Sequence, residues 1–122
     1  MSSFFCGDTA PTFKQLNDSA IKNTFINFLV NRKETTSLEI KNSLRIMGYY
    51  ATQERVSFYL AENYLKMPFG VSYRIETNPQ TGVQYRNYYP IDNREFQIYC
   101  LNHALAFLNK KDGEEEIGNV VI

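Results

Sequence analysis

The fold of this chain is decided by the stretch from Thr36 to Leu65, which reads TSLEIKNSLRIMGYYATQERVSFYLAENYL. It opens with a capping box, because the Thr36 hydroxyl can accept one backbone N–H while the Glu39 carboxylate accepts another. A helix is therefore predicted to start here. Its apolar residues recur at helical spacing: Leu38, Ile40, Leu44 and Ile46. Gly48 is expected to end it, since glycine takes the left-handed conformation that other side chains resist.

A second helix is predicted directly after a short turn. Tyr49, Tyr50 and Ala51 form the turn, and Thr52 offers a second capping hydroxyl. One apolar face of this helix is marked by Val56, Tyr59, Leu60 and Tyr64. Two short helices joined this tightly cross at a steep angle, the geometry that places the second helix of a helix-turn-helix in the major groove of DNA.

A supporting helix precedes this pair. Asp18 or Ser19 can cap it, and it is expected to run to about Asn31. Its apolar residues share one face: Ile21, Phe25, Phe28 and Leu29. The three helices together predict a small helical core.

A β-hairpin is predicted after the breakers Pro68 and Gly70. Residues 71–77 (VSYRIET) and 83–89 (VQYRNYY) have strand composition, and the turn sequence NPQTG lies between them. Alternation puts Val71, Tyr73 and Ile75 on one face of the first strand. A hairpin placed after a three-helix core is the wing of a winged helix, so the predicted fold is α+β: a winged helix, with three helices and a two-stranded wing.

One more helix is predicted after Pro90, capped by Asp92 or Asn93 and ending near Asn109. Its apolar residues cover nearly the whole circumference, so it must be buried on several sides. A domain this small can cover one of them, and a second copy of the chain is the simplest cover for the other. The residues assigned to this homodimer contact are Phe96, Leu101, Leu105 and Leu108.

These elements divide the chain into four parts. Residues 1–11 are expected to be a flexible N-terminus, and residues 12–90 the winged helix-turn-helix domain. Residues 91–109 form the packing and dimerisation helix. Residues 110–122 form an acidic tail that either frays or docks as a short strand.

Composition narrows the function class. The formal net charge is zero, with Lys and Arg together numbering 13 and Asp and Glu 13. The balance is uneven: residues 32–94 carry a net charge of +3 and residues 95–122 a net charge of −3. This small difference in net charge between the two parts of the chain favours nucleic-acid binding only weakly. No apolar run reaches the roughly 18 residues of a membrane span and no secretion signal opens the chain, so a cytoplasmic protein without membrane contact is expected.

Catalytic and cofactor chemistry has little support. Cys6 and Cys100 match no metal spacing and are interpreted as free thiols. His103 lies one turn from Cys100 among aromatic residues, a pattern more typical of a hydrogen-bonded core histidine than of a nucleophilic pair. There is no glycine-rich phosphate loop, and the three glutamates 114–116 are a charge run. We expect no enzyme, no cofactor and no metal.

The candidate DNA contacts lie on the predicted second helix of the pair. Gln53 can bond adenine through two atoms, Arg55 can do the same with guanine, and Ser57 is adaptable. The opposing interpretation is an ordinary polar helix face, which Glu54 favours because its carboxylate is repelled by phosphates.

Four further cations are candidate contacts to the DNA backbone. Lys41 and Arg45 lie one helical turn apart, a spacing suited to phosphates. Arg74 and Arg86 have two interpretations. Either they flank each other across the hairpin and reach a phosphate or the minor groove, or one of them pairs with Glu76 on a solvated strand face.

Part of the chain resembles a known family. Leu44, Gly48-Tyr49, Thr52-Gln53 and Val56-Ser57 are similar to the DNA-binding domain of the arginine repressor family, over about residues 36–66. The resemblance implies a winged helix that binds double-stranded DNA. In that family a basic residue follows the Val-Ser pair, and this chain has Phe58 there. Nothing resembles the family's arginine-binding domain, so arginine sensing is not implied.

Two functions remain open. The first is a small DNA-binding transcriptional regulator, which Gln53, Arg55 and Ser57 favour. The second is a winged helix that binds proteins, such as an adaptor or an inhibitor of a nucleic-acid-processing complex. Zero net charge, Glu54 and Phe58 favour the second. Nine tyrosines and nine phenylalanines are compatible with either an aromatic interaction surface or a core that lacks tryptophan.

Overall fold

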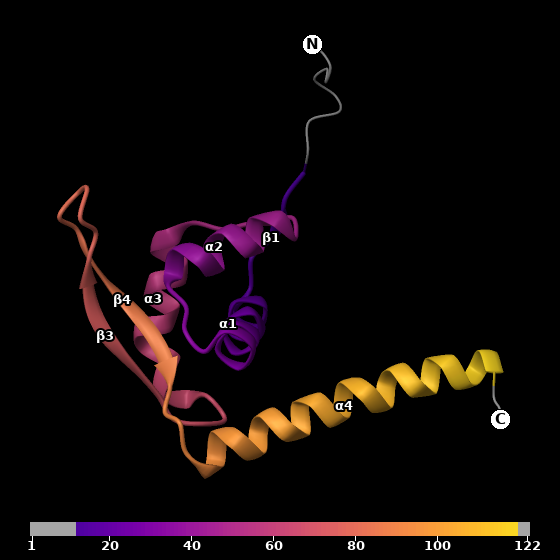
Figure 1. Ribbon diagram of the computed structural model, residues 1–122. Coiled ribbons are helices and arrows are strands. Elements are labelled where there is room, and N and C mark those ends of the chain that lie inside the picture. Colours follow the sequence, from indigo (N-terminus) through magenta and orange to yellow (C-terminus); the bar gives the residue numbers. More distant parts are fainter. Residues whose placement is uncertain (1–11, 120–122) are drawn as a thin grey trace.

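The computed structural model describes the backbone of residues 12–119 and the side chains of residues 12–106. This part of the chain is α+β and compatible with the predicted winged helix (Figure 1). Its elements, in chain order, are β1 (Lys14–Gln15), α1 (Asp18–Arg32), α2 (Ser37–Ile46), β2 (Tyr49–Tyr50), α3 (Gln53–Asn63), the 3-10 helix η3 (Tyr64–Lys66), β3 (Val71–Thr77), β4 (Gln84–Pro90) and α4 (Arg94–Asn119). The predicted flexible N-terminus, residues 1–11, lies outside the described residues.

Helix α1 is the central element of the core. It is capped by Asn17, whose Oδ1 accepts the N–H of Ala20 at 2.8 Å, so the predicted caps Asp18 and Ser19 are one and two residues late. The side chains of Ile21, Phe25 and Leu29 are fully buried. Because these positions are spaced by four residues, they form one stripe that the other elements cover.

Helices α2 and α3 start where the sequence predicts. Both halves of the Thr36 capping box are present, and the Thr52 hydroxyl accepts the N–H of Arg55 at 3.1 Å. The apolar face of α2 is narrower than predicted, because Leu38 is 45% exposed and Ile46 is 86% exposed. The buried residues of α2 are Ile40 and Leu44, both fully buried, and α2 packs against α1 and α3.

The turn between α2 and α3 contains a strand that the sequence did not predict. Residues Tyr49–Tyr50 form β2, which pairs in parallel with β1. The N–H of Lys14 donates to the carbonyl of Gly48 at 2.8 Å, and its ammonium lies 4.4 Å from the centre of the Tyr49 ring. The chain before α1 is thereby attached to the start of the helix pair. Gly48 has φ +96°, the left-handed conformation expected of it, two residues beyond the end of α2.

The hairpin forms as predicted, with β4 shifted by one residue to Gln84–Pro90. Tyr73 faces Tyr88 across the ladder, and Arg74 faces Asn87. Tyr88 is buried, with its ring edge-on to that of Phe25 at 5.5 Å. Two backbone hydrogen bonds between Thr35 and Tyr88, of 2.8 and 2.9 Å, fix the hairpin to the chain just before α2.

Helix α4 differs most from expectation. Asn93 caps it as predicted, with Oδ1 accepting the N–H of Phe96 at 3.1 Å. It does not end near Asn109 but continues to Asn119, through much of the predicted acidic tail. Lys and Glu, which make up half of residues 110–119, are good helix formers, and each of the two glycines there, Gly113 and Gly118, costs a helix only about 1 kcal/mol. The helix leaves the body and extends away from it (Figure 1).

The start of α4 is the part that joins the body. Phe96 is 4% exposed and packs on Phe69, with ring centres 4.9 Å apart. Leu101 and Leu105 are 60% and 47% exposed. The prediction of Phe96 in a dimer contact is therefore wrong, since it belongs to the core. The side chain of Leu108 lies outside the described residues.

Candidate nucleic-acid interface

The first turn of α3 faces a cavity shared with α2 and the hairpin. Its volume is about 510 Å³, and its lining includes Thr36 and Ser37 at the start of α2, Gln53 at the start of α3, and Val83 and Tyr85 on the hairpin. Gln53 is exposed. The N-terminal ends of both helices and one edge of the hairpin thus meet at a single place.

Arg55 points to the other side of α3. Its guanidinium donates to the Asp18 carboxylate at 2.6 Å. Both side chains are largely exposed, 42% for Arg55 and 67% for Asp18. An exposed pair of this kind contributes at most about 1 kcal/mol. The guanidinium is therefore held by α1, but weakly enough to exchange partners.

Ser57 is half-buried and bonded to α2. Its hydroxyl donates to the hydroxyl of Ser37 at 2.8 Å. An α-helix turns about 100° per residue, so positions 53 and 57 share the side toward α2 while position 55 lies toward α1. The three predicted base readers Gln53, Arg55 and Ser57 are therefore not brought together on one face.

The two cations of α2 lie on the same side of that helix but have different surroundings. The Arg45 Nε donates to the carbonyl of Ala51 at 2.6 Å, and its guanidinium lies 5.8 Å from the Tyr50 ring centre. Arg45 thus supports the turn between α2 and α3. Lys41 is half-exposed. Their contact with phosphates stays a prediction.

Arg74 is the centre of a polar network on one face of the hairpin. It donates to Glu34 at 2.6 Å and to Glu76 at 2.7 Å. Glu76 also accepts from Asn87 at 3.3 Å and from Tyr85 at 3.1 Å. The hydrogen bond from Arg74 is the main reason that the pKa of Glu76 is lowered, and the same bond raises the pKa of Arg74. The predicted alternative of an Arg74–Glu76 pair is confirmed.

Arg86 lies on the opposite face. It is opposite Ile75 in the ladder, and residues directly opposite each other share a face. Its guanidinium lies 4.1 Å from the Tyr73 ring centre and donates to the Tyr88 hydroxyl at 3.3 Å. This hydrogen bond raises the pKa of Arg86, while burial raises the pKa of Tyr88. The predicted flanking of Arg74 and Arg86 is wrong, because the observed register puts them on opposite faces.

The outward face of α3 carries exposed apolar side chains between Glu54 and Glu62, which the sequence analysis noted only at Phe58. Phe58 is 64% exposed and Leu65, in η3, is 74% exposed, with the exposed Ala61 between them. We call Phe58, Ala61 and Leu65 the α3 stripe. The signal was present in the sequence as an i, i+3, i+7 spacing opposite Val56 and Leu60.

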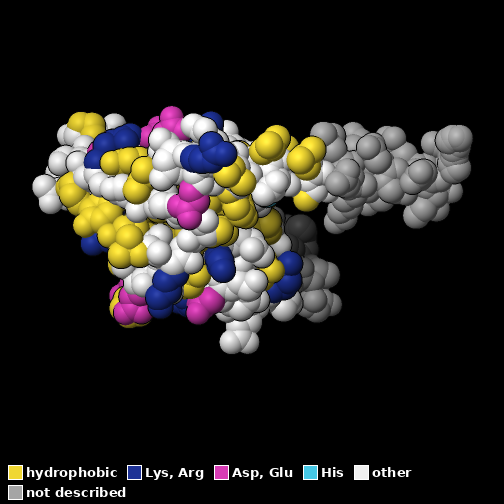
Figure 2. Space-filling view, turned by 90° about the horizontal axis from the view of Figure 1, so that it is seen from below, with side chains coloured by type: hydrophobic (Ala, Val, Ile, Leu, Met, Phe, Trp, Pro, Cys, Tyr) yellow, Lys and Arg dark blue, Asp and Glu magenta, His cyan; other side chains and the backbone are white. Residues whose placement is uncertain are grey.

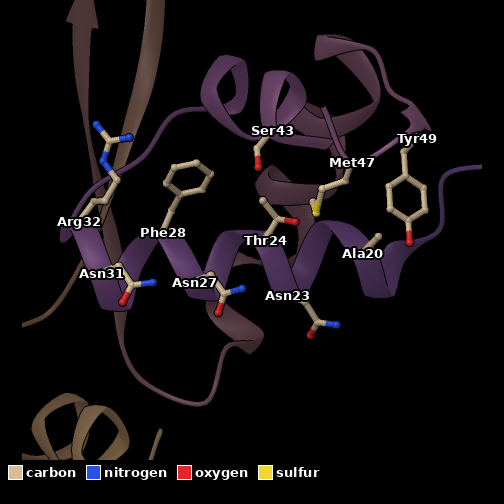
Figure 3. Close-up of a pocket in the computed structure, with 10 residues that line it drawn as sticks. All are labelled: Ala20, Asn23, Thr24, Asn27, Phe28, Asn31, Arg32, Ser43, Met47 and Tyr49. Carbon is tan, nitrogen blue, oxygen red and sulfur yellow. The ribbon is translucent and has the colours of Figure 1, made fainter. Parts of the chain in front are cut away.

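A second cavity lies between α1 and α2 (Figure 3). Its volume is about 380 Å³, and Thr24 and Phe28 of α1 face Ser43 of α2 and Met47, the residue after α2, across it (Figure 3). Its lining residues are mainly amide, hydroxyl and apolar side chains, with Arg32 the one cation among them. None of them carries a carboxylate, a thiol or an imidazole, so the lining has no group suited to acid–base catalysis at neutral pH.

The described residues also bear on metal binding, membrane spanning and thiol chemistry. No group of three or more His, Cys, Asp or Glu side chains within them is arranged to hold a metal ion. None of the helices in that part of the chain has the length and hydropathy that a membrane crossing requires. His103 is half-exposed rather than in the core, with its ring 6.2 Å from that of Tyr99, and Cys100 is half-buried as a free thiol. Cys6 lies outside the described residues.

Comparison with known proteins supports the fold. The chain resembles the crystal structure of a candidate transcriptional regulator from Thermoplasma acidophilum, with a TM-score of 0.51 and 17% identity over 85% of this chain and 96% of that one. It is also similar to Pex from a Synechococcus strain, with a TM-score of 0.49 and 13% identity over 81% of this chain and 91% of that one.

At these identities the likeness concerns the fold alone. No family model matches the chain, so the resemblance to the arginine repressor family has no support beyond the residues that carry it. No curated protein matches it either.

Proposed function

We propose that this protein is a DNA-binding transcriptional regulator of winged-helix type, without catalytic activity, that acts as a homodimer. The observation that carries the proposal is the meeting of the α2 and α3 N-termini with the hairpin around Gln53. The similar fold of a candidate transcriptional regulator, which spans 85% of this chain, also supports it.

The ends of the helices suit a polyanion. The unpaired N–H groups and the helix dipole make a helix N-terminus favourable for phosphate. Two such ends lie beside Gln53. The Thr36 capping box and the Thr52 hydroxyl each take one of these N–H groups, and Glu39 also lines the cavity, so a phosphate would meet the helix dipoles and the remaining N–H groups there while the amide bonds adenine. In helix-turn-helix proteins the N-terminal residues of the second helix are the ones that reach base edges. The DNA contact proposed here therefore uses the first turn of α3.

Arg55 is the second proposed base contact. In the free protein it pairs with Asp18, and an exposed pair is worth at most about 1 kcal/mol. A bidentate bond to guanine discriminates against a wrong base by about 1 to 3 kcal/mol. The weak pair with Asp18 leaves the guanidinium able to exchange its partner for guanine, and Asp18 holds it near the first turn of α3 until DNA arrives. Lys41 and Arg45 remain proposed phosphate contacts.

Helix α4 is the proposed dimer contact. Ile98, Leu101 and Leu105 are 46%, 60% and 47% exposed, and they recur at i, i+3 and i+7 on one face. Figure 2 shows hydrophobic side chains on the described part of the protruding helix. A symmetric dimer formed through these helices would present two α3 helices to half-sites about 34 Å apart.

The test is selection of a preferred duplex from a random library, followed by measurement of binding to it. Gln53→Ala and Arg55→Ala should each weaken binding by about 1 to 3 kcal/mol, because each deletes a base-edge contact without touching the core. Arg32→Ala at the exposed end of α1 and Gln97→Ala at an exposed position of α4 are the matched controls and should leave the affinity unchanged.

Two results would contradict the proposal. Failure to bind any duplex at low salt would remove DNA binding altogether. Equal affinity of the Gln53 and Arg55 variants and the wild type would remove the first turn of α3 from the contact.

A further inference from the structure

The α3 stripe has no role in the core or in the proposed DNA contact. Val56 and Leu60 are fully buried and define the inner side of α3. At 100° per residue, Phe58 and Ala61 lie on the opposite side of α3, and Leu65 follows in η3, where its side chain is 74% exposed. They are one to three turns beyond the first turn that holds Gln53.

The chemistry of the stripe is unusual for a helix exposed to solvent. A single exposed apolar side chain is common on protein surfaces and needs no explanation. Phe58 and Leu65, however, are 64% and 74% exposed and stand at the anchor spacing by which helices pack on each other. Phenylalanine is also among the aromatic residues enriched at protein interfaces.

Carboxylates border the stripe. Glu54 lies one turn before Phe58 and Glu62 one turn after it. Neither takes part in an ion pair among residues 12–106, whereas Asp18, Glu34, Glu39 and Glu76 all do. Of the cations nearest to them in the sequence, Arg55 is already paired with Asp18 at 2.6 Å. Lys66, one turn after Glu62, is exposed and forms no ion pair among residues 12–106, so the two carboxylates outnumber the one free cation beside the stripe. An apolar stripe bordered by free carboxylates repels phosphate and attracts a cationic partner.

We propose that the α3 stripe is a docking site for an amphipathic helix of a protein partner, one that carries an apolar ridge flanked by Lys or Arg. The ridge packs on Phe58, Ala61 and Leu65, where the small Ala61 lets the two backbones approach. The flanking cations meet Glu54 and Glu62. This contact goes beyond the proposed DNA binding and does not depend on it.

The test is selection from a display library of helix-forming peptides against the purified full chain in the absence of DNA. Enriched peptides should carry apolar residues at i, i+3 or i+4, and i+7, with basic residues beside them. Their affinity should fall at least about tenfold for the double variant Phe58→Ala, Leu65→Ala, because truncation removes the two exposed anchors. Glu54→Gln with Glu62→Gln should weaken binding several-fold and reduce its dependence on salt.

Ile46→Ala is the matched control. Ile46 is an apolar residue of α2 that is 86% exposed and lies outside the stripe, so its truncation should not affect peptide affinity. Thermal unfolding of each variant should match the wild type, since none of these side chains is buried.

Three outcomes would overturn the proposal. The first is enrichment of peptides without this pattern, or with equal affinity for the double variant. The second is a change in oligomeric state of the double variant by sedimentation, which would assign the stripe to a second copy of the chain. The third is loss of duplex binding by the double variant with no peptide enriched, which would assign it to DNA.

Discussion

Helices α1 and α4 are both rich in apolar residues, yet they use them differently. In α1 the side chains of Ile21, Phe25 and Leu29 are fully buried, because α2, α3 and β4 all pack against that helix. In α4, Phe96 is buried but Leu101, five residues later, is 60% exposed. The difference shows that apolar residues stabilise the monomer only where the chain supplies a cover. Elsewhere they are free to bind something else.

Removing a core residue of α1 should have the largest effect. Phe25→Ala deletes a fully buried ring that packs edge-on against Tyr88 at 5.5 Å, so the free energy of unfolding should fall by about 3 to 5 kcal/mol. Denaturant titration followed by circular dichroism measures it. Phe58→Ala is the control, since the same truncation at a 64% exposed site should change stability by less than about 0.5 kcal/mol. Similar losses for both variants would contradict the assigned core.

Introducing charged residues on α4 should have the next largest effect, and the effect should be on assembly rather than on folding. Leu101→Glu with Leu105→Glu puts two carboxylates into the proposed apolar contact, which should weaken the dimer by about 3 kcal/mol, or about a hundredfold. Sedimentation velocity across a concentration series measures this. The far-ultraviolet spectrum should be unchanged, because both side chains face solvent in the monomer.

Ile46→Glu, at the most exposed of the large apolar side chains described, is the control for a charge introduced elsewhere and should leave the dimer intact. A wild-type chain that stays monomeric at high micromolar concentration would contradict the proposed dimer contact, because the exposed face of α4 would then have no role in self-association.

Local signals were sufficient for most of the fold. The caps of α2 and α3 depend on Thr36, Glu39 and Thr52, which act within one turn, so the sequence alone places them. The hairpin was predictable for the same reason, since its turn sequence lies between two runs of strand composition. By contrast, the pairing of β1 with β2 joins residues far apart in the chain and involves only Lys14–Gln15 and Tyr49–Tyr50. No local pattern encodes so short a contact.

The candidate site was predicted less well than the fold. The sequence indicates which residue types are able to bind DNA, and their contact with DNA stays a prediction. The directions of their side chains depend on which neighbours pack on each side of the helix or strand. Arg55 turns toward Asp18 because α1 lies there, and Arg86 turns inward because the register sets it opposite Ile75. The α3 stripe was overlooked because apolar spacing in the sequence does not say which of two faces the core covers.

The smallest effect is expected in the polar network around Arg74 on the hairpin. It tests how much an exposed contact contributes to stability in comparison with the buried contacts of α1. Arg74 lowers the pKa of Glu76 below its ordinary value, so the carboxylate stabilises the fold while it is ionised. This contribution is present above the pKa of an unfolded glutamate and is lost as the pH falls through the lower pKa of the folded state. Glu76→Gln should therefore reduce stability slightly at neutral pH, and the difference from the wild type should shrink as the pH falls below about 4.

Denaturant midpoints of both proteins over a pH series measure this difference in stability, with Glu62→Gln as a control outside the network. A constant difference at every pH would mean that Glu76 acts through packing rather than charge. A loss as large as that of Phe25→Ala would mean that exposed polar contacts, and not the buried stripe of α1, hold the hairpin to the body.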